Sequence, residues 1–176
     1  MAIFSSPIRP WLLPSAVLLA AQTIWGALRY PHLPGRIPWH IGSGAVDTWA
    51  DKSVGSAFIL VFVYAGVTVV TAGSAELTLR VTPRDELTAA NTPFAAARAA
   101  SSLINRPASR ASARRIARAV LLLNACIGTS LLMGCGLFWR STPDPNVPVG
   151  LLAAMLVPVL IGTAVVIGAA ARDRKR

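Results

Sequence analysis

The chain has 176 residues, of which 54% are hydrophobic and 14% are charged, and its formal net charge is +10 at pH 7. A soluble globular domain usually carries about 25% charged residues, so this composition excludes an ordinary water-soluble fold and is typical of an integral membrane protein. The positive charge does not indicate nucleic-acid binding, because no aromatic residues are interleaved with the arginines to stack on bases. We therefore expect no nucleic-acid partner.

Four apolar runs without Asp, Glu, Lys or Arg cover residues 11–28, 54–75, 119–139 and 149–171. At about 1.5 Å per residue, each run can cross a hydrocarbon core of about 30 Å. We predict a single all-α domain over residues 1–176, with four transmembrane helices and a multi-pass location in the cell membrane. The first run is longer than the apolar region of a signal peptide, which is about 7–15 residues, and this length favours a retained span over a cleaved leader.

The distribution of basic residues predicts the orientation of the bundle. Residues 76–118 contain eight arginines and three acidic residues, whereas residues 29–53 contain three basic and two acidic residues. The segment after Ala171 contains four basic residues and one acidic residue. Because loops rich in Lys and Arg stay in the cytoplasm, we expect the 76–118 loop and both termini inside and the 29–53 loop outside. The arginines would then face anionic membrane lipids.

The basic inner loop has a local signal for a helix. Thr82 is a candidate N-cap, Pro83 suits the first helical position, and Asp85 and Glu86 would lie in the first turn, where the helix dipole favours anions. These residues predict a short helix over about residues 83–103 on the inner membrane surface. An alanine-rich linker of no fixed form is the alternative.

The four spans contain few polar side chains. They have no deeply placed Asp, Glu, Lys, Arg or His, which ion-coupled carriers usually need near the middle of the membrane. The polar exceptions are Tyr64, Thr68, Thr71 and Asn124. We expect Asn124 to make a structural hydrogen bond between helices, worth about 1 kcal/mol.

The outer loop, residues 29–53, is the candidate functional site. Its three prolines favour an extended, stiff backbone, and its glycines permit turns. His40 and Asp47, with His32 and Asp51, supply nitrogen and oxygen groups of the kind that Zn²⁺ binds, but their spacing matches no standard metal motif. The alternatives are that Asp47 caps the second span while His40 hydrogen-bonds within the loop, that the loop binds a ligand or peptide, or that His40 and Asp47 bind a metal.

The loop also resembles a known family. Its pattern is similar to Y-x-x-L-P-x-x-I-P-x-H followed by G-x-x-D-x-W-x-x-K, a motif of a bacterial membrane family of unknown function. The same module forms the N-terminal part of the SdpI-type immunity proteins. The matching residues are Tyr30, Leu33, Pro34, Ile37, Pro38, His40, Gly44, Asp47, Trp49 and Lys52.

A second, looser likeness concerns the third span. Arg114 and Arg115 before it, followed by Leu122, Leu123 and Asn124, resemble the short, actinobacterial-type members of the same family. The SdpI-type proteins have further spans and a second domain, so their immunity and signal-receptor roles carry over poorly. The resemblance implies a place in the cell membrane and an important outer loop, and it implies no reaction.

These observations predict a non-enzymatic binding or accessory protein without a cofactor, whose outer loop recognises a peptide, a lipid headgroup or a partner protein. A small transporter or a subunit of a transport complex is one alternative, and a metal-dependent envelope enzyme that uses His40 and Asp47 is another. The expected ligand-binding residues are Tyr30, Pro34, Pro38, His40, Asp47, Trp49 and Lys52.

Overall fold

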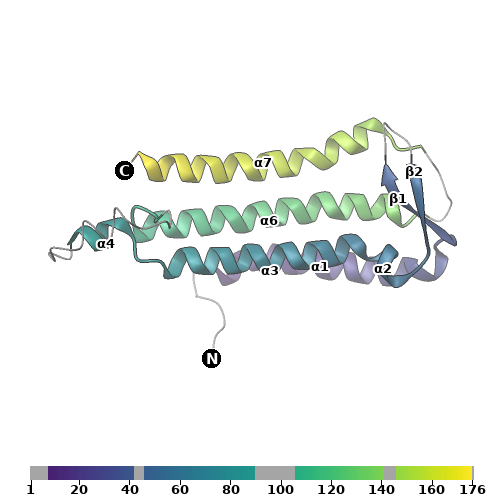
Figure 1. Cartoon of the computed structure of the whole chain (residues 1–176), viewed down its shortest axis with the longest axis horizontal. Helices are drawn as coiled ribbons and strands as arrows, with labels where there is room; N and C mark the ends of the chain where they lie inside the picture. Colours follow the sequence, from purple (N-terminus) through teal and green to yellow (C-terminus); the bar gives the residue numbers. More distant parts are fainter. Residues whose placement is uncertain (1–7, 42–45, 90–105, 141–145, 176) are drawn as a thin grey trace, which may run out of the picture.

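A computed structural model describes residues 8–41, 46–89, 106–140 and 146–175. The fold is mostly helical, and four long helices run side by side (Figure 1). These are α1 (Arg9–Arg29), α3 (Ile59–Arg80), α6 (Arg110–Phe138) and α7 (Val149–Arg174). All four are long and apolar enough to cross a membrane, so the predicted four-helix membrane fold is confirmed.

Helix α6 is the central helix of the bundle, and it packs against α1, α3 and α7. Helix α7 packs mainly on α6, and its only buried residues are Gly162, Ala169 and Asp173. Gly162 sets the close approach of these two helices, since a Cβ atom there would lie 2.9 Å from Cδ1 of Leu123. Small residues at helix contacts are the usual means of packing in membrane bundles.

Two of the four helices differ from the predicted ranges at their N-terminal ends. The second run begins with a separate turn, α2 (Val54–Ala57), and α3 starts only after Phe58, whose φ of −107° and ψ of 12° interrupt the helix. The third helix starts at Arg110 instead of residue 119, because the side chain of Ser109 caps it by accepting a hydrogen bond from the backbone N–H of Ser112. The first turns of α6 therefore carry arginines.

The described part of the basic 76–118 segment between α3 and α6 includes α4 (Arg84–Ala89), with Asp85 and Glu86 in its first turn. The remainder of the helix predicted over residues 83–103 lies outside the described residues. The start of α4 is tied to the segment before α6, where the N–H of Arg84 donates to the carbonyl of Pro107 over 3.0 Å. This connection lies at the end of the bundle where α7 also ends (Figure 1).

The opposite end of the bundle carries a two-stranded antiparallel hairpin that the all-helical prediction did not include (Figure 1). A short 3-10 turn, η1 (Tyr30–His32), leads from α1 into β1 (Arg36–Ile41), which pairs with β2 (Val46–Asp51). Pro38 pairs in register with Trp49, and an irregularity follows between Pro38 and His40. The prolines predicted extended backbone here, and pairing of the two extended segments makes the hairpin.

Candidate functional site

A buried aliphatic residue on each strand attaches the hairpin to the bundle. On β1, Ile37 is completely buried and packs in a cluster with Leu33 and Trp139. On β2, Val46 is buried with Leu137 and Val147, and Trp49 packs against this second cluster. Because both strands have apolar attachments to the helices, the hairpin presents its outer side chains in a defined geometry.

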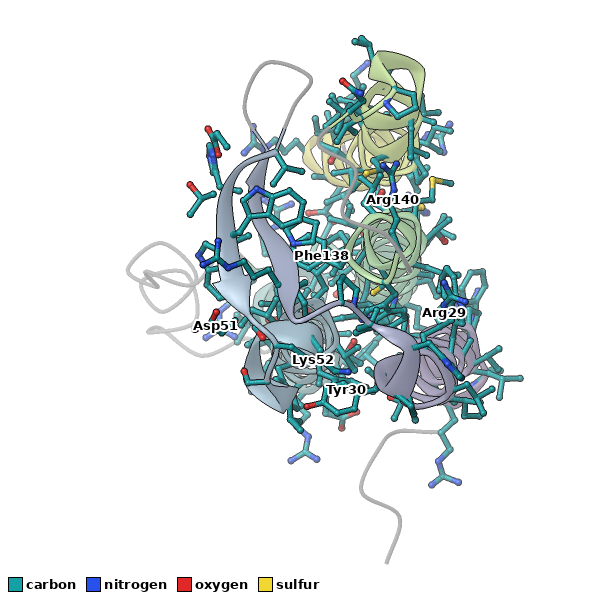
Figure 2. The ribbon with its side chains drawn as sticks, turned by 90° about the vertical axis from the view of Figure 1, so that its right-hand side faces the viewer. Arg29, Tyr30, Asp51, Lys52, Phe138 and Arg140 are labelled. Atoms are coloured by element: carbon teal, nitrogen blue, oxygen red, sulfur yellow. The ribbon has the colours of Figure 1, made fainter. Side chains whose placement is uncertain are left out.

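Lys52 and Tyr30 close the base of the hairpin. The Lys52 ammonium donates to the carbonyl of Leu33 over 3.1 Å and lies 5.0 Å from the centre of the Tyr30 ring. Its backbone N–H donates to the carbonyl of Gly35 over 2.9 Å. Figure 2 looks onto this end of the molecule and shows Tyr30 and Lys52 beside each other. These two predicted ligand-binding residues are thus engaged in holding the loop together.

Trp139 stabilises the helix ends beneath the hairpin, and sequence reasoning missed this role. It is 2% exposed, its ring meets that of Trp25 edge-on with centroids 5.3 Å apart, and it also packs on Phe58. Its carbonyl accepts hydrogen bonds from Nε and Nη2 of Arg29, over 3.3 and 3.1 Å. The only signal in the sequence is its position as the last residue of the third apolar run, where a tryptophan commonly lies at the headgroup level.

His40 and Asp47 form an exposed pair on the outer face of the hairpin. Nδ1 of His40 lies 2.7 Å from Oδ1 of Asp47, and the two side chains are 66% and 53% exposed. The hydrogen bond from His40 lowers the pKa of the Asp47 carboxyl below its ordinary value of 3.8. Trp39, next to His40 in the chain, is 47% exposed. A hydrogen-bonded pair so open to solvent contributes little to stability.

The cap of the second apolar segment is Ser53 and not Asp47. The Ser53 hydroxyl accepts a hydrogen bond from the N–H of Ser56 over 3.0 Å, and the Ser56 hydroxyl accepts one from the N–H of Ser53 over 2.9 Å. The capping interpretation of Asp47 is therefore wrong, because its carboxylate is turned toward His40.

The remaining loop candidates differ in how far they are exposed. Pro38 is buried, Pro34 is half-buried, and His32 and Asp51 are exposed. Within the described ranges, no three side chains of His, Cys, Asp or Glu come close enough together to hold a metal ion. The arrangement at His40 and Asp47 therefore offers one imidazole and one carboxylate for hydrogen bonding.

A second group of polar side chains lies inside the bundle, between α1, α3 and α6. Nδ2 of Asn124 donates to Oγ of Ser15 over 2.8 Å and to Oγ1 of Thr68 over 3.1 Å. Thr71, the other threonine singled out in the sequence, instead bonds the carbonyl of Val67 in its own helix. Asn124 therefore joins three helices, and Ser15 was not anticipated as its partner.

Gln22 is the other polar residue that sequence reasoning missed. It is completely buried, and its Nε2 donates to the carbonyl of Gly128 over 2.8 Å. Tyr64 packs directly on Gly128 from the side of α3. Among the described residues, neither Oε1 of Gln22 nor the Tyr64 hydroxyl has a hydrogen-bond partner. Gln22 is the only glutamine in the chain and lies in an apolar run, so its isolation was a signal visible in the sequence.

Comparison with known proteins identifies part of the chain. Residues 17–64 match the model of a domain of unknown function, DUF1648. No curated protein and no solved structure matches the chain. The matched residues run from α1 through the hairpin into α3, and they include the His40–Asp47 pair and the Lys52–Tyr30 contact. Residues 17–64, with the hairpin at their centre, are therefore similar to this domain of unknown function.

Proposed function

We propose that this chain is a non-enzymatic membrane binding protein that recognises an extended peptide segment of a partner through the outer face of its hairpin. The observation that carries the proposal is the exposed His40–Asp47 pair beside Trp39, on a hairpin whose inner residues are buried in the bundle. Because the hairpin is held against the bundle, these exposed side chains lose little conformational entropy when a ligand binds.

The chemistry of this face suits a peptide. Asp47 supplies an acceptor, and the bond to Asp47 orients the His40 ring so that Nε2 points away from the carboxylate. Trp39 adds a large aromatic surface of the type that dominates binding energy at protein interfaces. The described sheet has only two strands, so each is an edge strand with backbone groups able to pair with an added strand.

The proposal contains no catalytic step. Within the described residues, no third His, Cys, Asp or Glu joins the His40–Asp47 pair in a group that could hold a metal ion, so we assign it no metal. The excess of arginines at the opposite end of the bundle supports an outward-facing hairpin in the plasma membrane with both termini inside. The likeness of the Tyr30–Lys52 pattern to the N-terminal module of the SdpI-type proteins also supports the hairpin as the binding surface.

Crosslinking in living cells tests the proposal. A photo-reactive amino acid at position 39 should give a discrete adduct with a partner, and Asp47→Asn in the same chain should abolish that adduct. Val149, which is 73% exposed at the start of α7, provides a matched position at the same end of the bundle and should give no such adduct. The His40→Ala variant should also fail to complement a deletion strain while it remains inserted and folded.

Two results would count against the proposal. A fully functional His40→Ala protein, together with the same adducts from positions 39 and 149, would reduce the hairpin to a connector. Elemental analysis that finds one equivalent of Zn²⁺ in the wild type, lost from both His40→Ala and Asp47→Ala, would favour the envelope-enzyme alternative.

A further inference from the structure

A groove of about 850 Å³ opens between α6 and α7 at the end of the bundle away from the hairpin. Its two walls come from antiparallel helices, and Trp11 of α1 contributes at one edge. On α6, Arg115, Arg118 and Leu122 recur at three- and four-residue spacing, so they lie on one face of the helix. The groove therefore begins among arginines and continues into an apolar part of the bundle.

The charged part of the groove has an excess of positive charge. Its lining includes Arg114, Arg115, Arg118 and Arg172, and none of these four forms a salt bridge within the described part of the chain. Arg118 lies over the Trp11 ring, with 5.7 Å between the guanidinium carbon and the ring centre. Four arginines thus line one groove, and the fork of donors on each guanidinium group suits an anion, particularly the oxygens of a phosphate.

Within the described part of the chain, the acidic residue next to Arg172 forms no salt bridge with these four arginines. Asp173 follows Arg172 in α7, but it is buried on another side of the helix. Its carboxylate accepts hydrogen bonds from the N–H of Ala108 over 2.8 Å and from the hydroxyl of Ser112, and it lies 3.6 Å from Arg84. The negative charge is thus used to hold the inner segment against α7, and the groove keeps its positive charge.

The other part of the groove is apolar and open. Leu122, Ile161 and Val165 line it, and they are 37%, 56% and 39% exposed. Gly168 lies between this apolar part and Arg172, and a Cβ atom built on it would meet nothing within 4 Å. The missing side chain therefore leaves space where the charged and apolar parts join.

We propose that this groove binds one anionic phospholipid, with the headgroup phosphate on the arginines and the upper part of an acyl chain along Leu122, Ile161 and Val165. A free phosphate would use only the charged half of the groove. The apolar half lies within helices α6 and α7, which can cross a membrane, so it is positioned to meet hydrocarbon. Basic pockets between transmembrane helices are suited to lipid headgroups for this reason. This inference is independent of the hairpin and of the proposed peptide binding.

The test measures lipid binding to the purified chain in a neutral maltoside detergent, where no charged bilayer surface contributes. Dioleoyl phosphatidylglycerol is titrated and its bound copies are counted by native mass spectrometry. We expect one phosphatidylglycerol per chain at concentrations where dioleoyl phosphatidylcholine, which carries no net charge, stays unbound. Arg115→Gln/Arg118→Gln should weaken phosphatidylglycerol binding at least roughly tenfold, since hydrogen bonds between charged groups are the strongest of their kind.

Two matched variants separate a specific site from general attraction. Arg174→Gln/Lys175→Gln also removes two positive charges, from exposed residues at the end of α7 that do not line the groove, and it should leave binding unchanged. Gly168→Leu should abolish binding by filling the groove, whereas Gly73→Leu, which also enters open space on an exposed part of α3, should not. Unfolding temperatures of all variants show that each is folded.

Three outcomes would overturn the inference. Equal retention of phosphatidylglycerol and phosphatidylcholine would show that the groove does not select a lipid by its charge. An equal loss of binding in Arg174→Gln/Lys175→Gln and in Arg115→Gln/Arg118→Gln would show attraction to the whole basic end of the bundle. Displacement of the lipid by inorganic phosphate at a similar concentration would show an anion site in which the acyl chain has no part.

Discussion

The indole Nε1 of Trp139 donates a hydrogen bond of 2.8 Å to the carbonyl oxygen of Ala57. This bond joins the residue that ends α6 to the last residue of α2, immediately beneath the hairpin. Both partners are buried, so removal of the donor would leave a carbonyl without its partner in an apolar setting.

Substitution of Trp139 tests whether this end of the bundle depends on the bond. We expect Trp139→Phe to lower the free energy of unfolding by about 1–3 kcal/mol through the unpaired carbonyl, and Trp139→Ala to lower it by about 3–5 kcal/mol through loss of packing. Unfolding in detergent, followed by circular dichroism, measures both. Trp39→Phe is the control, because Trp39 is half-exposed and should change stability little. Equal stability of Trp139→Phe and wild type would show that this hydrogen bond does not stabilise the fold.

A second prediction concerns the helix contact at Gly128. A Cβ atom there would overlap Cζ and the hydroxyl oxygen of Tyr64, so Gly128→Ala should destabilise the bundle by about 1–3 kcal/mol. Gly66→Ala, where a Cβ meets nothing within 4 Å, is the matched control and should be neutral or slightly stabilising. The Tyr64→Ala background should reduce the effect of Gly128→Ala. Equal stability of Gly128→Ala and Gly66→Ala would show that α3 and α6 do not approach each other closely at Gly128.

The buried amide of Asn124 gives a third prediction. Asn124→Ala removes the hydrogen bonds to Ser15 and Thr68 and should cost about 1 kcal/mol, the usual size of such bonds in membrane bundles. Thr71→Val is the control, since Thr71 bonds only carbonyls of its own helix. The double variant Asn124→Ala/Ser15→Ala should lose no more unfolding free energy than the two single variants lose when their losses are added. A cost for Thr71→Val equal to that for Asn124→Ala would mean that the contact between helices adds nothing.

The pKa of Asp47 supplies a fourth prediction. Because the bond from His40 lowers the pKa of the folded-state carboxyl below 3.8, the pair stabilises the hairpin above that pH. This contribution is lost as the pH falls below 3.8 and through the folded-state pKa. Carbon NMR of the labelled carboxyl should show the pKa of Asp47 rising toward 3.8 in His40→Ala. No change in the Asp47 titration after His40→Ala would contradict the pairing.

The orientation of the chain gives a fifth prediction. In a background without Cys126 and Cys135, a cysteine at Thr48 should react with an impermeant thiol reagent on intact cells, and one at Lys175 should react only after lysis. Thr48 is exposed on the hairpin and Lys175 is exposed beyond the end of α7, so accessibility within the protein is comparable. Both positions leave the Ser109 cap of α6 intact. The opposite labelling pattern would place the hairpin in the cytoplasm.

The four helices could be predicted because each apolar run is long and free of charge, and such a run leaves a helix as the only stable way across a bilayer. The start of α6 was placed less accurately than the spans themselves, because Arg110, Arg114 and Arg115 were assigned to the preceding loop. The signal that decides it is local, a serine at position 109 whose hydroxyl caps the helix. The hairpin was missed because its strands are short and the prolines before and within β1 indicate extended chain without indicating its partner.

The contacts that define the sites depend on which helices are neighbours, and this information is not local. Asn124 was visible as a polar residue in an apolar run, but its partner Ser15 is 109 positions away and follows from the packing of α1 on α6. The groove is similar, because Arg118 and Arg172 are brought together only by the antiparallel pairing of α6 and α7. The pairing of His40 with Asp47 likewise requires the hairpin register.

The central place of α6 has a consequence for how the chain is made. The ribosome delivers α1 and α3 first, yet these two helices pack mainly on α6 and only slightly on each other. Until the third span enters the membrane, Ser15 and Thr68 lack Asn124 and must remain without their final partner in lipid or in the translocation channel. The contacts that join α1 and α3 through α6 therefore form only after the third long helix has been made.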